Sequence, residues 1–254
     1  MVTVNNLNIE DNVNYLVEEV TYRSVPNRGQ QTNSVSRRPK TKLTANEWQY
    51  KEIEIKGRVF GTSPSDMRNY LDTLQQNFAV PSLTLAIDTD RSYTATLESL
   101  DIPTQHFNNS MIQYDAKFIA TDPFAYAGLV TASGTVVSGT VTYSGSITVS
   151  GTVFAEPLLT INPTGANSGN SGINALKYTH VPTGETMTVS GTFSYSSPLV
   201  IDFNNFLVTN SGVSSDFTGI FSRFEPGVTP YTITVSSGIH NGFNYSWSYQ
   251  PRYY

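Results

Sequence analysis

The sequence predicts a mostly β protein with two domains, an N-terminal α+β domain that contains one helix and a C-terminal β-sandwich. Charged residues make up only 14% of the 254 residues, whereas the strand-favouring aromatics are abundant, with 15 Tyr and 13 Phe. Residues 1–126 contain 12 of the 15 Lys and Arg residues but only 3 of the 18 Gly. The content of charged residues and the content of glycine therefore both change near residues 128–139, and we expect domains at 1–133 and 134–254.

The first domain is expected to contain three strand regions. Apolar and charged residues alternate over 53–59, which is typical of a half-buried strand. A hairpin is expected over 83–97, with its turn at Asp-Thr-Asp-Arg, residues 88–91. A last strand over 112–118 leads into the sequence Asp-Pro-Phe at 122–124.

The spacing of apolar residues predicts one helix after the strand at 53–59. Ser63 is a candidate N-cap, Pro64 stands at the first helical position, and Asp66 lies in the first turn near the positive end of the helix dipole. Pro81 ends the helix. The apolar stripe recurs every three or four residues and consists of Met67, Tyr70, Leu71, Leu74 and Phe78.

A polar segment lies between Tyr22 and Trp48 and is too long for an ordinary loop. Two interpretations are open, a solvated flexible loop or an arm that reaches a neighbouring subunit. In the second interpretation its basic residues contact the neighbour, and they could pair with acidic residues such as Glu52, Glu54 or Asp66. The subunit-interface candidates are Arg23, Arg28, Arg37, Arg38 and Lys40.

The second domain is expected to be an all-β sandwich, of jelly-roll type. The sequence Ser-Gly-Thr-Val recurs irregularly at 133–136, 138–141 and 150–153, which indicates repeated turn-then-strand chemistry. Strands are expected at 146–154, 158–161, 173–179, 186–193, 199–202, 206–209, 218–224, 231–235 and 244–249.

The residues that usually carry catalysis or bind metals form no recognisable pattern. The chain has no Cys, which excludes thiol catalysis and thiolate metal sites. His106, His180 and His240 are far apart in the sequence, and no motif for a nucleophile, phosphate or zinc site occurs. We therefore expect no enzyme activity, no cofactor and no metal.

Charge and hydropathy limit the partners. A net charge of −5 argues against broad nucleic-acid binding, and no apolar run approaches the ~20 residues of a membrane helix. The first ten residues lack the features of a signal peptide.

The last strand offers three aromatic residues on one face, Tyr245, Trp247 and Tyr249. Exposed rings of this kind stack on saccharides, and this would make the chain a carbohydrate-binding module or adhesin. We favour a core position, because Ser246 and Ser248 alternate with the rings as in a half-buried strand.

The order of elements in residues 1–126 resembles the distal tail proteins (Dit) of siphophages that infect Gram-positive bacteria. The resemblance rests on the polar segment, the strand and helix after it, the sequence Asp-Arg-Ser-Tyr at 90–93, and Asp-Pro-Phe at 122–124. It implies a tail-tube-like β-sandwich followed by a sandwich of the galectin or carbohydrate-binding-module type.

The resemblance also implies a structural role at the tip of a phage tail. Proteins of this family form a hexameric hub ring that stacks on the tail-tube protein and docks the tail-associated fibre or lysin protein. DNA passes through the ring without specific binding. The peripheral domain holds receptor-binding proteins or binds cell-wall saccharide in some phages. The implied location is the virion, after synthesis in the host cytoplasm.

Overall fold

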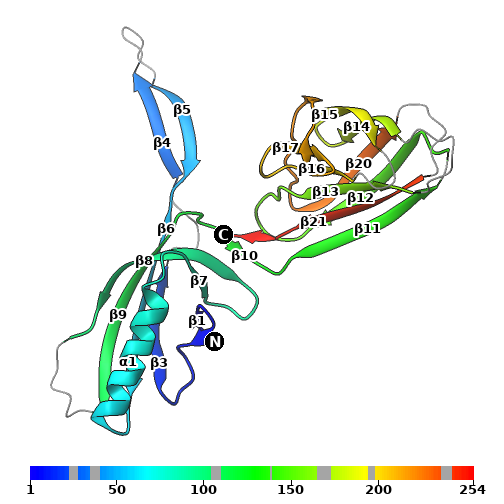
Figure 1. Cartoon of the computed structure of the whole chain (residues 1–254). Helices are drawn as coiled ribbons and strands as arrows, with labels where there is room; N and C mark the ends of the chain where they lie inside the picture. Colours follow the sequence, from blue (N-terminus) through cyan, green and yellow to red (C-terminus); the bar gives the residue numbers. More distant parts are fainter. Residues whose placement is uncertain are drawn as a thin grey trace. The chain divides into compact units, whose positions relative to one another are not determined.

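The structure is a computed structural model of the whole chain (Figure 1). It describes residues 1–22, 41–103, 110–137, 139–164, 173–193, 198–235 and 242–254, and also strand residues 28–34; over 28–34 and 41–47 only the backbone is described. The chain divides into two compact units, Met1–Ala127 with Tyr254, and Gly128–Tyr253. The domain boundary predicted between residues 133 and 134 falls inside strand β11 (Val130–Val137).

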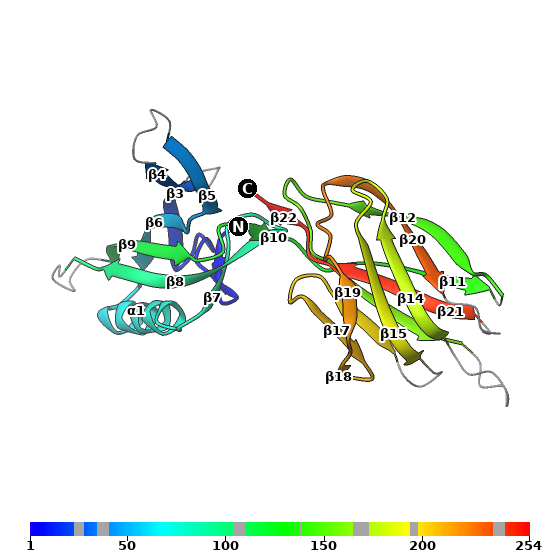
Figure 2. The same ribbon diagram turned by 90° about the horizontal axis from the view of Figure 1, so that it is seen from above.

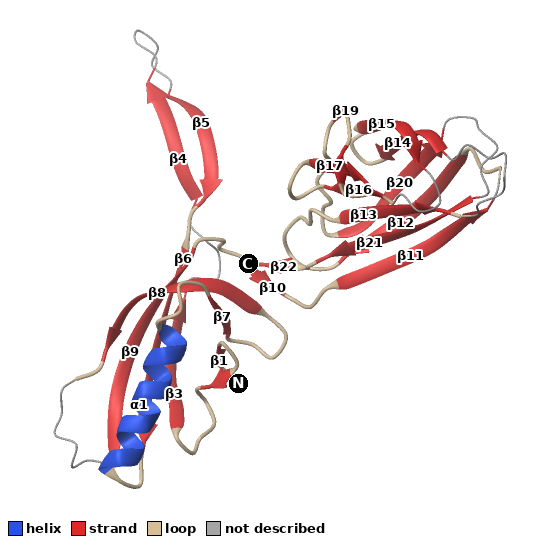
Figure 3. Cartoon of the chain, viewed as in Figure 1, coloured by secondary structure: helices blue, strands red, loops and turns tan. Residues whose placement is uncertain are grey.

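The prediction of a mostly β protein is confirmed, and the described residues contain one helix, as expected (Figure 3). The first unit contains an antiparallel sheet in the order β2-β1-β7-β8-β9-β6-β3. Strand β8 pairs with β7 through its first half and with β9 through its second half. The strands are β1 (Thr3–Val4), β2 (Leu7–Asn8), β3 (Tyr15–Tyr22), β6 (Lys51–Phe60), β7 (Leu83–Ala86), β8 (Ser92–Asp101), β9 (Met111–Ala120) and β10 (Ala125–Tyr126).

Helix α1 (Pro64–Phe78) has the predicted ends. The Ser63 hydroxyl accepts a hydrogen bond from the backbone N–H of Asp66 at 3.1 Å, which satisfies one of the free donors of the first turn. The helix buries Met67, Leu71, Leu74 and Phe78, whereas Tyr70 is only half-buried. The Phe78 ring packs edge-on against Tyr114 and Phe118 of β9, and this contact fixes the helix on the sheet.

The polar segment between Tyr22 and Trp48 contains two strands, β4 (Arg28–Ser34) and β5 (Thr41–Trp48). They pair antiparallel with each other and form a two-stranded sheet of their own. We call these two strands the hairpin.

The second unit is a sandwich of two antiparallel sheets (Figure 2). One sheet has the order β11-β21-β13-β16-β17-β18 and the other β12-β20-β14-β15-β19. Besides β11, the strands are β12 (Thr142–Val149), β13 (Leu158–Pro163), β14 (Ile173–His180), β15 (Thr186–Phe193), β16 (Leu199–Asp202), β17 (Leu207–Asn210), β18 (Val213–Ser214), β19 (Phe217–Gly219), β20 (Gly227–Val235) and β21 (Gly242–Tyr249).

Two strands predicted in this unit end earlier than expected, and a glycine marks each end. The strand expected over 146–154 ends at Val149, and Gly151 follows with φ +110°. The strand expected over 218–224 ends at Gly219, with φ +124°. A Cβ atom at Gly219 would lie 2.0 Å from the carbonyl oxygen of Thr186, so only glycine fits there.

The core of the second unit is aromatic. The Trp247 ring lies 5.1 Å from Tyr231, 5.4 Å from Phe224, and 6.0 Å from both Tyr178 and Phe203, measured between ring centroids. All five side chains are almost completely buried. This cluster joins strands of both sheets, and we expect it to dominate the stability of the unit.

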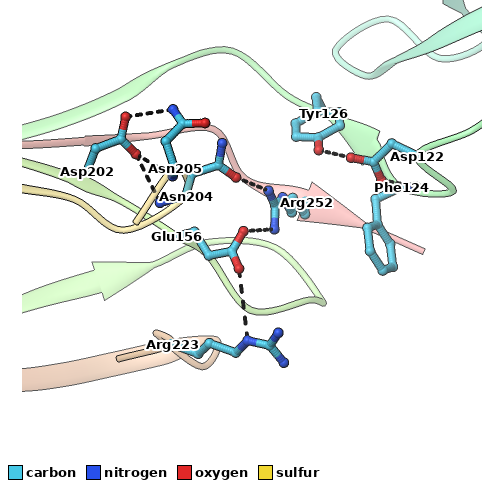
Figure 4. Close-up of polar contacts among 9 residues, drawn as sticks. All are labelled: Asp122, Phe124, Tyr126, Glu156, Asp202, Asn204, Asn205, Arg223 and Arg252. Atoms are coloured by element: carbon cyan, nitrogen blue, oxygen red, sulfur yellow. Dashed lines mark hydrogen bonds and ion pairs between the residues drawn. The ribbon is translucent and has the colours of Figure 1, made fainter. Parts of the chain in front are cut away.

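A polar cluster holds the last strand of the chain, β22 (Arg252–Tyr253), against the second unit (Figure 4). The Arg252 guanidinium contacts the Glu156 carboxylate at 2.8 Å and donates to the side-chain oxygen of Asn204 at 3.2 Å. Arg223 approaches the other oxygen of Glu156 at 3.9 Å. Asp202 accepts the backbone N–H of Asn204 and so fixes the turn that presents it.

Candidate functional site at the root of the hairpin

The two ends of the hairpin segment meet at a buried lysine. Lys51, the first residue of β6, is only 2% exposed. Its Nζ donates a hydrogen bond to the hydroxyl of Tyr93 at 2.9 Å. The same atom lies 4.7 Å from the centre of the Tyr93 ring and 5.3 Å from the centre of the ring of Tyr22, the last residue of β3. Lys51 therefore links the strand before the hairpin to the strand after it.

The alternation of β6 explains why this lysine is buried. The strand turns every second residue inward, and Lys51 occupies the first inward position, ahead of Ile53 and Ile55. Burial lowers the pKa of the Lys51 ammonium to about 8. No ion pair between described residues includes Lys51, so its charge is stabilised by a hydroxyl and two aromatic rings.

An aromatic cluster lies at the end of β5. The Trp48 ring lies 5.7 Å from Phe124 and 5.5 Å from Tyr254, and the last two rings are 5.9 Å apart. Asp122 accepts the backbone N–H of Phe124 at 3.2 Å and the hydroxyl of Tyr126 (Figure 4). The Asp-Pro-Phe sequence thus forms a turn that directs a buried Phe ring onto the hairpin root.

A hollow of about 370 Å³ opens at the same root. Its lining carries three carboxylates, and of these Glu54 forms an ion pair with Lys56 at 3.2 Å. Glu52 and Glu98 are exposed and form no ion pair with a described residue. The complete lining is Thr21, Tyr22, Gln49, Tyr50, Lys51, Glu52, Ile53, Glu54, Glu98 and Lys117. We call it the acidic hollow.

A strand irregularity places Glu98 at this hollow. The pairing of β8 with β9 shifts between Leu97 and Ser99, so that Glu98 is an extra residue in its strand. Such a bulge interrupts the alternation of faces and re-aims a side chain.

The predicted interface residues belong to the hairpin segment. Arg23, Arg37, Arg38 and Lys40 lie outside the described residues. Arg28 is the first residue of β4, and its side chain lies outside the described part of the chain. Their role in subunit contact stays a prediction.

The three aromatics considered for saccharide stacking occupy the sandwich. Trp247 and Tyr249 are 1% and 4% exposed and belong to the hydrophobic core. Tyr245 is partly buried, and its hydroxyl lies 2.6 Å from that of Tyr143. The rings therefore do not form the open platform that a saccharide needs, which corrects their assignment as stacking residues in favour of the core alternative.

Sequence reasoning named Glu52 and Glu54 as partners for the basic segment but missed Lys51 and Glu98. The signal for Lys51 was present, because Lys51 continues the inward positions 53, 55, 57 and 59 by one step. No comparable signal existed for Glu98, since a bulge depends on the partner strand.

The described residues contain no group of three or more His, Asp or Glu side chains placed to hold a metal ion. Within the same residues, none of the helical structure is long and apolar enough to cross a membrane.

Comparison with solved structures finds the same fold in a phage distal tail protein. The SPP1 Dit protein, whose crystal structure is described as a paradigm of the hub adsorption apparatus in phages that infect Gram-positive bacteria, aligns with 100% of this chain and 98% of its own, with a TM-score of 0.73 and 13% identity. Two baseplate structures of phage p2 in its activated conformation, with Ca and with Sr, align at TM-scores of 0.45 and 0.39 and identities of 9% and 10%, each over 91% of this chain and 90% of theirs. No protein-family model and no curated protein sequence matches the chain.

Proposed function

We propose that this chain is a structural hub protein of a phage tail tip. In this role six copies form a ring that joins the tail tube to the tail-associated fibre or lysin protein, and the ring leaves a lumen for DNA. The first unit makes the ring, and the second unit is peripheral. The protein acts in the virion without catalysis, cofactor or membrane insertion.

The observation that carries this proposal is the end-to-end likeness to a phage hub protein. The alignment, with a TM-score of 0.73, extends over 100% of this chain and 98% of the other, so it includes both units and is not limited to one common sandwich. The fold is thus the one that the Dit resemblance of residues 1–126 implies, and the likeness extends to the second unit, where the sequence resembles the family only in type.

The geometry of the first unit suits a ring. A closed ring needs a heterologous contact, in which two different surfaces of the same chain meet. The hairpin and the acidic hollow are two such surfaces with different chemistry. DNA must pass through the lumen without being held there, and a basic lining would bind its phosphates. The net charge of −5 is consistent with this requirement.

The test is the native mass of the purified protein, measured by light scattering behind a sizing column over a range of concentrations. We expect a species of six times the 27.9 kDa chain mass. If the ring requires a template, the hexamer is expected on addition of tail-tube protein. A chain that stays monomeric under both conditions would contradict the proposal and favour a binding module, which a glycan-binding assay on the chain would then examine.

A further inference from the structure

We infer that the acidic hollow receives arginine side chains from the hairpin of a neighbouring copy of this chain. The inference rests on the proposed ring and assigns one of its subunit contacts. It pairs the acidic hollow with the polar segment between Tyr22 and Trp48, which is rich in basic residues.

The hollow carries more acidic than basic side chains and therefore attracts a cationic group. Glu52 and Glu98 reach the lining from β6 and β8 and have no ion-pair partner among the described residues. The lining stays acidic as a whole, because it carries three carboxylates and only two lysines. Lys51 directs its ammonium to the Tyr93 hydroxyl, and Lys117 lies opposite Glu54 in the pairing of β6 with β9. Two carboxylates in one hollow thus remain available to a partner.

Two tyrosine rings in the same hollow favour arginine over lysine. Tyr22 and Tyr50 line it and are 38% and 51% exposed. A guanidinium stacks on an aromatic face and at the same time donates paired hydrogen bonds to a carboxylate. An ammonium is a compact, strongly hydrated charge and makes less use of this combination.

The hairpin segment supplies that chemistry. The segment between Tyr22 and Trp48 contains six basic residues and one acidic residue, Glu47. The first unit as a whole carries more acidic than basic residues, so the segment is a local reversal of charge. The basic residues are Arg23, Arg28, Arg37, Arg38, Lys40 and Lys42.

The strand register indicates that the occupant comes from another copy. The hairpin pairs Arg28 with Trp48 at its root and Ser34 with Thr41 at its far end. Seven residues of strand separate the two ends, which is roughly 20 Å at the rise of a β-strand. Tyr22 and Gln49, which flank the hairpin, both line the hollow, so the hairpin starts at the rim of its own hollow, and the length of its strands separates its far end from that root. Arg37 and Arg38, which follow Ser34, are thus expected to reach a neighbour's hollow and not their own.

A charge-swap experiment tests the contact. One variant reverses the hollow, Glu52→Arg with Glu98→Arg, and a second reverses the hairpin, Arg37→Glu with Arg38→Glu. Each variant alone brings like charges together, and we expect the dissociation constant for assembly to rise at least about tenfold. In an equimolar mixture every contact pairs opposite charges, and assembly is expected to return to within about threefold of wild type.

A matched control keeps the change in net charge but not its place. The variant Asp72→Arg with Glu225→Arg replaces two exposed carboxylates outside the hollow and should assemble like wild type. Hydrogen exchange of β6 and β9 checks that each variant folds. If the reversed hollow disrupts folding, Glu52→Gln with Glu98→Gln keeps the shape and should weaken assembly and lower its salt dependence.

The outcomes separate the contact from the ring. If wild type forms the ring and both reversed variants also form it, or if the mixture fails to regain what each variant lost, the contact is refuted and the hub role stands. If wild type remains monomeric, even with tail-tube protein, both the ring and this contact are refuted. Loss in each variant with recovery in the mixture supports the contact.

Discussion

The replacement Lys51→Met is expected to stabilise the first unit at neutral pH. Lowering the pKa of this lysine from 10.5 to about 8 corresponds to about 3 kcal/mol spent on keeping the ammonium charged in the folded state. The contacts with Tyr93 and Tyr22 offset about 1–2 kcal/mol of it. Methionine has a similar length and no charge, so the free energy of unfolding should rise by roughly 1–2 kcal/mol at pH 7.

The pH dependence gives the sharper test. The unfolded chain holds the lysine proton up to about pH 10.5, whereas the folded chain releases it near pH 8. In this interval the unfolded state binds more protons, and the stability of wild type therefore rises with pH. The variant lacks this contribution, so its advantage should shrink by about 2 kcal/mol between pH 7 and pH 10.

The assay is urea unfolding at each pH followed by a hydrogen-exchange pulse, with β6 and β9 read by mass spectrometry. These strands report on the first unit alone. Other groups that titrate in this range are common to both proteins and cancel in the difference. Lys117→Met, at an exposed position of the same sheet, is the control and should show no such trend. A constant difference between wild type and Lys51→Met across the range would refute the argument that Lys51 is charged and buried.

Three further predictions concern packing and protonation in each unit. Gly57→Ala should destabilise the first unit by about 2 kcal/mol or more, because a Cβ atom there would lie 2.4 Å from the Leu16 carbonyl oxygen. In calorimetry the unfolding transition of the second unit should stay unchanged. Phe124→Ala should cost about 3–5 kcal/mol and, by removing the ring that contacts Trp48, should speed hydrogen exchange at the end of β5. Burial lowers the pKa of His180 below its usual 6.5, so the second unit should lose stability as the pH falls below about 6.5, and His180→Gln should remove this loss in denaturation curves.

The sequence was sufficient where the determinants are local. Helix α1 follows from a cap at Ser63, a proline at the first position and an apolar stripe, all of which act within a few residues. The alternation of β6 and the antiparallel pair β7–β8 follow from period-two patterning in the same way.

Prediction was weaker where a residue's environment depends on a distant strand. Strands β1 and β2 join through Asn5 and Asn6, both at positive φ, and their place beside β7 depends on a partner some 80 residues away in the sequence. The ends of β12 and β19 differ from expectation because glycine conformation and contact with Thr186 set them.

The sequence by itself determined the mostly β class, the single helix, the basic segment and the resemblance to phage distal tail proteins, because composition, periodicity and short motifs are properties of the chain alone. Only the tertiary structure showed that Tyr22, Lys51 and Tyr93 meet at the root of the hairpin and that Glu52 and Glu98 share one hollow. Burial of a charge and convergence of side chains arise from the packing of strands far apart in sequence, and no local pattern encodes them.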